Sequence, residues 1–276
     1  MARLLVLSFV LLLGSLTASA QYGWEAGGWA GVSYYFGDLN TNFRLNRPAL
    51  AGGINARYNF NKRLCMKLAA SYGQVSADDA ESENIFERAR NLNFQSDIID
   101  GTAQFEFNFF TYTHGSKDEF YTPYLFAGLS VFHFNPQTEF DGDLVDLRPL
   151  GTEGQFKGEE YSQVSAALAY GAGMKIDLSY RWSINVEISA RRLMTDYLDD
   201  VSTVYPDLDD LARARGADAA ALSDRSILIE GVNDTSIGEP GRQRGNSEDN
   251  DSFVFVGVSF MYYFGDLRCP PYSQRY

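Results

Sequence analysis

The sequence contains few cysteines, few basic residues and no long apolar run after its first twenty residues. Two cysteines among 276 residues are too few for a disulfide-rich scaffold. A net charge of −13 argues against a nucleic-acid partner, because phosphate binding needs a basic face. Without a run of about 18 consecutive apolar residues, no transmembrane helix is predicted. An aromatic content of 14% is compatible with two classes, a soluble β protein and a transmembrane β-barrel. The strands of a membrane barrel alternate apolar and polar residues, so an averaged hydropathy does not detect them.

Histidine is also scarce, and this limits the possible chemistry. The two histidines are His114, in a short turn, and His133, at the end of a predicted strand. No G-x-S-x-G elbow, H-E-x-x-H pair or glycine-rich phosphate loop occurs. We therefore predict no enzyme, no catalytic or cofactor-binding residue and no cofactor.

The N-terminus has the pattern of a secretory signal peptide. Arg3 precedes an apolar core at 4–13, and Ala18-Ser19-Ala20 resembles a cleavage site. We expect residues 1–20 to be removed, 21–267 to form one barrel domain that includes a long loop at 195–251, and 268–276 to be a periplasmic tail.

Apolar and polar residues alternate with a period of two, which is typical of strands with one polar face. Eight segments follow the pattern, at 23–36, 48–60, 63–75, 91–110, 121–134, 161–178, 181–194 and 252–264. The alternation in the fourth slips near Ser96 to Ile99, which indicates a bulge or a longer strand extending past the membrane.

Short and long connections alternate along the chain. The short ones are 61–62, 111–120 and 179–180, and the long ones are 37–47, 76–90, 135–160 and 195–251. A membrane barrel with periplasmic termini has short turns on the periplasmic side and long loops on the extracellular side. A soluble β-sandwich does not require short and long connections to alternate. We predict an all-β fold, an eight-stranded antiparallel barrel in the outer membrane.

Charged residues lie on the predicted inner face. An eight-stranded barrel is filled by its own side chains, so these charges should pair with one another. We interpret them as a closed polar plug; a proton or solute path is the alternative. The predicted interior charges are Arg57, Lys67, Glu106, Lys175, Asp177, Glu187 and Arg191.

The hexapeptide YYFGDL occurs at 34–39 and again at 262–267, at the ends of the first and last predicted strands. Because these strands must pair antiparallel, the copies should lie at opposite membrane interfaces. The alternation directs Tyr34, Phe36, Tyr262 and Phe264 toward lipid, as in aromatic girdles. Gly-Asp then starts a turn.

The two cysteines are both predicted at the periplasmic end. Cys65 begins the third strand and Cys269 follows the last, in an oxidising compartment. A disulfide between them is a hypothesis; free thiols are the alternative.

The longest loop, 195–251, is where surface function is expected, although a solvated loop without function is the alternative. A helix is predicted at 207–222 with Asp207 as its N-cap. Two acidic clusters, TDYLDDVS (195–202) and SEDNDS (247–252), could bind Ca²⁺, but they lack EF-hand spacing. We therefore favour turn formation and strand capping and predict no metal site.

Six motifs together resemble the PorG-like outer-membrane proteins of the Bacteroidota. They are YYFGDLN, RARNLNFQSDI, YTPYLFAGLSVFHFNP, RPLGTEGQ, RRLMTDYLDDVSTVY and RGNSEDNDSFVFVGV, in this order. The resemblance covers nearly all of the mature chain, and GTEGQ and TDYLDDVS are its most specific parts.

This resemblance implies a non-enzymatic component of the type IX protein secretion and gliding machinery. Its expected partners are outer-membrane lipid and the periplasmic ring, built of a lipoprotein and a partner protein. Contacts are expected on the turn 111–120 and on the tail 268–276. The alternative is a surface binding or adhesion barrel acting through loops 135–160 and 195–251; a narrow channel or a small lipid enzyme is weaker.

Overall fold

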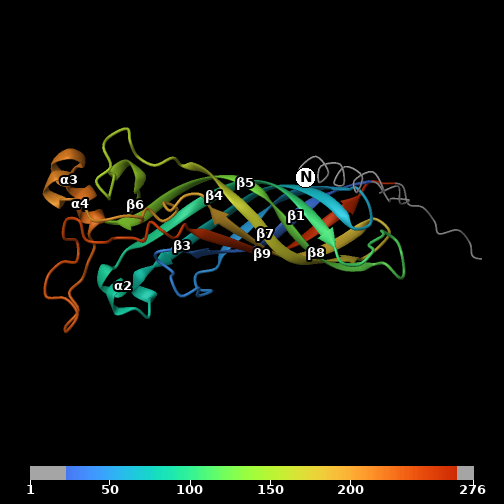
Figure 1. Cartoon of the computed structure of the whole chain (residues 1–276), viewed down its shortest axis with the longest axis horizontal. Helices are drawn as coiled ribbons and strands as arrows, with labels where there is room; N and C mark the ends of the chain where they lie inside the picture. Colours follow the sequence, from blue (N-terminus) through green and yellow to red (C-terminus); the bar gives the residue numbers. More distant parts are fainter. Residues whose placement is uncertain (1–22, 266–276) are drawn as a thin grey trace, which may run out of the picture.

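The chain forms a closed antiparallel barrel of eight strands (Figure 1). The computed structural model describes residues 23–265, so the predicted signal peptide and the tail 268–276 lie outside the described residues. The barrel strands are β1 (Gly23–Phe36), β2 (Ala49–Asn59), β3 (Leu64–Asp78), β4 (Asn93–Asn108), β5 (Tyr121–Phe140), β7 (Val164–Asp177), β8 (Trp182–Leu193) and β9 (Ser252–Tyr263).

Each strand pairs with its sequence neighbours, and the pairing of β1 with β9 closes the ring. A ninth strand, β6 (Asp143–Asp146), continues from β5 as a hairpin outside the barrel. The predicted fold class is confirmed. The eight strands match their predicted ranges to within three residues, except that β5 runs on to Phe140.

One local prediction was wrong, and of the two explanations offered for the fourth strand the longer strand is confirmed. The predicted helix at 207–222 is two helices, α3 (Leu208–Arg215) and α4 (Ala217–Ser223), because Gly216 between them has φ of 106°, which ends α3. Asp207 does cap α3, its side chain accepting from the amide of Asp210. The register of β3 with β4 runs unbroken past Ser96, so β4 contains no bulge there, and the strand is simply long.

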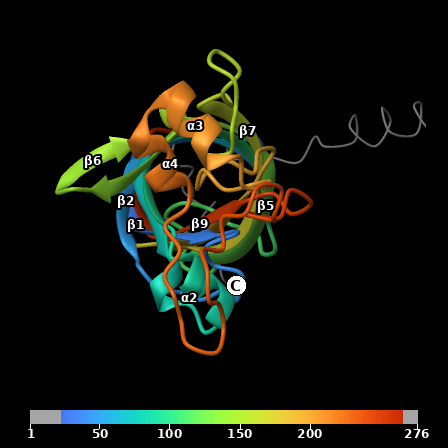
Figure 2. The ribbon, with the colours of Figure 1, turned by 90° about the vertical axis from the view of Figure 1, so that its left-hand side faces the viewer.

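The connections divide the barrel into two different ends. The turn end carries the short connections 60–63, 109–120 and 178–181, and the loop end carries the long ones. At the loop end the chain folds into a cap that contains η1 (Asp79–Glu81), α2 (Ile85–Arg90), η2 (Arg148–Leu150), α3 and α4 (Figures 1 and 2). Within residues 23–265, no helix is long and apolar enough to span a membrane.

The outward positions of the barrel strands are apolar. Leu50, Ile54 and Phe105 are 84%, 68% and 63% exposed. Aromatic side chains gather on the outer face toward the turn end, where Trp182 stacks on Phe260 with ring centroids 4.6 Å apart. An exposed apolar belt of this extent marks a surface that contacts lipid or another protein.

The first copy of the hexapeptide, 34–39, and the described part of the second, 262–265, lie at opposite ends of this barrel. Tyr34 pairs with Val254, while Tyr262 pairs with Ala26. In each copy the first tyrosine and the phenylalanine point outward, and the middle tyrosine, Tyr35 or Tyr263, is buried inside.

The glycine of each copy has a specific packing role. A Cβ on Gly37 would collide with Asp251 Oδ1 and with the hydroxyl of Tyr35, and a Cβ on Gly265 would collide with the hydroxyl of Tyr263. The inward tyrosine therefore folds across the glycine two residues later. The sequence Tyr-Tyr-Phe-Gly thus places the first tyrosine and the phenylalanine on the outer face and the middle tyrosine inside the lumen.

We expect Gly37→Ala and Gly265→Ala each to destabilise the barrel by about 1–3 kcal/mol, because the inward tyrosine, and at Gly37 also Asp251, must move. The measurement is the heat-induced mobility shift of the folded barrel in cold detergent electrophoresis. Gly28→Ala is the matched control, since the nearest atom to its Cβ would lie at 3.5 Å. Equal melting of all three variants would contradict the packing role.

Candidate functional site: the lumen and its two closures

A buried ion-pair network fills the half of the lumen nearest the turn end. The carboxylate of Glu106 on β4 lies 2.8 Å from Arg57 Nε and 2.7 Å from Lys175 Nζ. Arg57 also contacts Glu25 on β1 at 2.9 Å. These four side chains are at most 1% exposed, so each charge depends on its partners rather than on water.

Further charge pairs lie next to the Glu106 cluster and between it and the loop end. Lys67 contacts Glu187 at 2.5 Å, and Glu187 also accepts a hydrogen bond of 2.6 Å from Tyr124. Closer to the loop end, Arg191 contacts Asp100 at 3.2 Å. The predicted interior charges all lie in the lumen; sequence reasoning missed Glu25, Asp100 and His114, which complete their pairing.

The turn 109–120 folds back and closes the turn end. His114 Nε2 lies 3.1 Å from Glu25, and Nδ1 lies 2.8 Å from Asp177. Its ring stacks on Tyr263, with centroids 4.3 Å apart, and Tyr112 donates to Asp177 at 2.6 Å. Burial opposes the charge on His114, but the hydrogen bonds to Asp177 and Glu25 outweigh it and raise its pKa to about 9.

With His114 protonated, the lumen charges cancel. Among the described residues there are five acids and five bases, listed here with the acids first: Glu25, Asp100, Glu106, Asp177, Glu187, Arg57, Lys67, Lys175, Arg191 and His114. A neutral lumen is what burial in a low dielectric requires. His114 is therefore a structural counter-ion, a role that its place in a short turn of the sequence did not predict.

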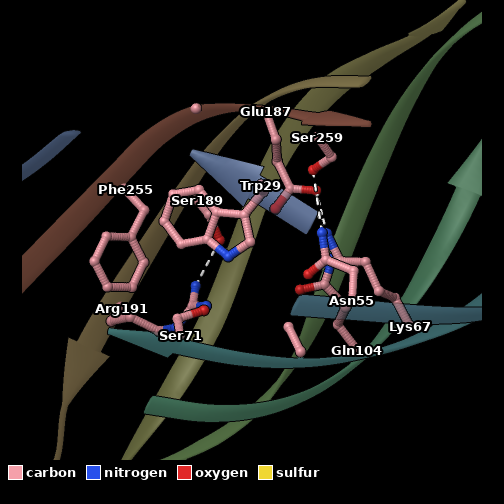
Figure 3. A pocket seen from close by; sticks show the side chains of 12 residues that line it. Trp29, Asn55, Lys67, Ser71, Gln104, Glu187, Ser189, Arg191, Phe255 and Ser259 are labelled. Carbon is pink, nitrogen blue, oxygen red and sulfur yellow. Dashed lines mark hydrogen bonds and ion pairs between the residues drawn. The ribbon is translucent and has the colours of Figure 1, made fainter. Parts of the chain in front are cut away.

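The middle of the lumen contains a small cavity (Figure 3). Its volume is about 30 Å³, and its walls include Trp29, Lys67, Gln104, Glu187 and Arg191. Figure 3 shows Lys67 directed at Glu187 and Asn55 at Ser259, as their hydrogen bonds require. This space accommodates about two water molecules and no larger solute.

An apolar layer closes the lumen beneath the cap. Phe132, Phe134 and Phe253 are at most 1% exposed, and the rings of Phe132 and Phe253 lie 5.7 Å apart. Leu193, Ile98 and Phe255 complete the layer. Together with the ion-pair network, this layer leaves no open path through the described barrel.

The cap above this layer is held by two buried arginines. Arg90 binds Asp79 at 2.7 Å and donates to the backbone oxygens of Arg244 and Asp38. Arg244 contacts Glu153 at 3.2 Å. Loops distant in sequence are thereby joined, so the long loop is an ordered part of the fold.

The most specific motifs of the sequence meet in this cap. Glu153 of GTEGQ accepts hydrogen bonds from the amides of Ser202 and Thr203, at the end of TDYLDDVS. Thr152 of the same motif donates to Asp200 at 2.5 Å. These motifs therefore build the cap.

A cluster of carboxyl groups lies at the base of the cap. The hydroxyl of Tyr35 is 2.6 Å from Asp199 and 2.9 Å from Asp251. The phenol has one proton to donate and can also accept, so a protonated acid at either position would complete the pair of contacts. Burial, followed by the charge of neighbouring acids, raises the pKa of Asp199 and Asp251 well above the usual range.

Neighbouring acids share this environment. Burial is the main cause that raises the pKa of Asp196 to about 7 and those of Asp38 and Asp200 to about 6. Asp199 also caps the turn at Val201, and Asp251 accepts from the amide of Leu198. Within residues 23–265 no group of His, Cys, Asp or Glu side chains could hold a metal ion.

The proposed disulfide stays a prediction. Cys65 is fully buried in the lumen, where its thiol donates to Asn59 at 2.9 Å. Cys269 lies outside the described residues.

A model of the family described as "Domain of unknown function (DUF6089)" matches residues 2–217. The chain belongs to this family. Among curated proteins none matches this DUF6089 chain.

Solved structures of similar shape are distant outer-membrane proteins. Neisserial surface protein A is 12% identical, with a TM-score of 0.44 over 88% of this chain and 97% of that one. Ail, the attachment invasion locus protein of Yersinia pestis solved with a heparin analogue, is 11% identical, with a TM-score of 0.41 over 88% and 99%. OprG of Pseudomonas aeruginosa is 13% identical, with a TM-score of 0.41 over 90% and 98%. The fold of this chain rests on its own strand pairing.

The His114 counter-ion predicts a pH dependence. Its folded pKa of about 9 lies above the ordinary 6.5, so its stabilisation is complete below pH 6.5 and is lost as the pH rises through 9. We expect a loss on the order of 2–3 kcal/mol, measured by urea unfolding in detergent. His114→Gln should be less stable at pH 6 and close to wild type at pH 9.5. His133→Gln, outside the network, is the control; identical profiles for all three proteins would refute the assignment.

The cap should respond to pH over a lower range. Because the carboxyl pKa values are raised, the folded cap binds more protons than the open one, so its stability is greatest in acid and falls as the pH rises through 6–7. Limited proteolysis of the loop 194–251 at pH 5 and pH 8.5 measures this. Asp199→Asn should reduce the difference, whereas the exposed Glu230→Gln should leave it unchanged. Faster cleavage at pH 5 would overturn the prediction.

Proposed function

We propose that this chain is a closed, non-enzymatic β-barrel of the outer membrane that acts as a component of the type IX protein secretion and gliding machinery. In this role it contacts the periplasmic ring and fixes it to the membrane. The observation that carries the proposal is the combination of an apolar outer belt with a lumen that is closed by ion pairs and aromatic rings.

The outer belt supports membrane insertion. Its exposed leucine, isoleucine and phenylalanine side chains lie on a ring of strands with no free edge, as a lipid-facing barrel requires. On this placement the turn end faces the periplasm and the loop end faces outward, because short turns are periplasmic in such barrels. An N-terminal signal peptide fits the same route.

The closed lumen supports an anchoring role rather than transport. A cavity of about 30 Å³ passes no secreted protein and no nutrient. The resemblance of GTEGQ and TDYLDDVS to motifs of the PorG-like proteins is the reason for assigning this anchor to the type IX machinery.

The turn end offers a defined surface for the ring. Tyr112 and His114 are buried, and the exposed polar residues of the turn 109–120 are Lys117 and Asp118. Tyr180, which is 67% exposed, lies beside this turn, since a Cβ on Gly115 would meet its ring. A protruding tyrosine on the same end of the barrel as Lys117 and Asp118 is typical of a protein contact.

Gene deletion followed by complementation tests the proposal. Deletion should abolish export of type IX cargo, and wild-type protein should restore it. A triple variant, Lys117→Ala with Asp118→Ala and Tyr180→Ala, should enter the membrane but fail to restore export or to co-purify the ring lipoprotein. The matched control is Leu228→Ala, an exposed side chain at the loop end. Intact export in the deletion strain would sink the secretion role.

The ordered cap favours a second candidate, a surface binding or adhesion barrel. Phe156 and Leu228 of the cap are 77% and 68% exposed. Phe156→Ser with Leu228→Ser should then reduce attachment of whole cells to a surface without changing export. Unchanged attachment would remove this candidate.

A further inference from the structure

A polar groove opens on the outer face of the barrel at the loop end. Strands β3, β4 and β5 reach beyond their neighbours, and β5 leaves β4 after Gln137, which pairs with Gln95. From there β5 pairs with β6 instead. The fork between β4 and the hairpin encloses about 390 Å³, which is the volume of a small-molecule site.

The groove is built from outward-facing amide, hydroxyl and carboxyl groups. Ser76, Gln95 and Gln137 are aligned across three strands by the sheet register. Among the described residues, the side chains of Ser76, Gln95 and Glu139 have no hydrogen-bond partner and are therefore available to a ligand. The Gln137 amide is fixed by a hydrogen bond of 2.7 Å to Asp146, so part of the site is preorganised.

The charge of the groove selects among ligand classes. Its one guanidinium, Arg47, is already paired with Asp78 at 3.0 Å, which leaves no free cation for a phosphate. The neighbouring edge strand β6 has four residues and begins and ends in aspartate, which discourages addition of a peptide strand. Hydroxyl-rich neutral ligands match the remaining donors and acceptors, and the half-exposed Leu144 gives them an apolar edge.

The position of the groove indicates where such a ligand comes from. On the same outward face, Tyr72 pairs with Ile99, and both are more than half exposed in the apolar belt. Ser76 and Gln95 lie four residues farther along their strands, or about 13 Å at the usual rise. If the belt lies in the membrane, as proposed above, the groove lies at the level of the lipid head groups.

We propose that this groove binds the neutral saccharide of an outer-leaflet glycolipid. The inference rests on the outer-membrane placement, but its chemistry can be tested apart from it. Binding is expected through Gln95 and Glu139, with Leu144 against the sugar ring.

The test uses purified barrel and lipopolysaccharide from the strain that carries the gene. Oligosaccharide released from that lipopolysaccharide and fluorescently labelled is titrated against the barrel in detergent. In a second assay, binding of the barrel to nanodiscs that contain the intact glycolipid is compared with its binding to nanodiscs of phosphatidylethanolamine. Gln95→Ala with Glu139→Ala should weaken both interactions at least tenfold. Gln74→Ala with Asp97→Ala, a hydrogen-bonded pair on the same face outside the groove, is the matched control and should change binding less than twofold.

Several results would overturn the inference. Equal binding by wild type and the groove variant would do so, as would preference for an extended peptide over the oligosaccharide. Binding of free oligosaccharide without preference for glycolipid nanodiscs would assign the groove to a soluble glycan and exclude the head group. Cell fractionation separately tests membrane placement, so its failure is distinguishable from failure of saccharide binding. The heat-induced mobility shift verifies that each variant is folded.

Discussion

The buried carboxylate of Glu106 is the constraint on which the structure depends. It is fully enclosed by an eight-stranded barrel, whose lumen has room only for side chains. Arg57 and Lys175 must therefore approach it, and their own charges require further acids. Removing one partner from such a network is costly, because a charge remains in a low dielectric. The lumen is filled rather than open because these charged side chains must remain paired with one another.

The same requirement explains both ends. At the turn end, His114 lies between Glu25 and Asp177 and supplies the fifth positive charge, and its ring stacks on Tyr263. At the loop end, Tyr35 bridges two carboxyl groups that belong to distant parts of the chain. One sequence motif thus supplies an inward tyrosine at each end, although the partners differ: an imidazole in one case and a carboxyl pair in the other.

Much of this fold could be predicted from the sequence because strand alternation is local. The parity that places Glu106 inside also places Asp100 inside, and the parity of β1 places Glu25 inside, so both signals were present. No local signal identifies His114, since its role depends on a turn folding back into the lumen. The break at Gly216 and the fork between β4 and β5 depend likewise on contacts between distant segments.

The two motifs most specific to the PorG-like resemblance lie in the cap and not at the turn end. GTEGQ and TDYLDDVS are joined to each other inside the cap, so they report how the loop end is built. A ring contact, by contrast, would use the turn end, where the exposed residues carry no such motif. Because ion pairs and packed rings fill the barrel between these ends, the lumen cannot open without unpairing buried charge. A closed lumen of this kind is consistent with the anchoring role proposed above and gives no support to a transport role.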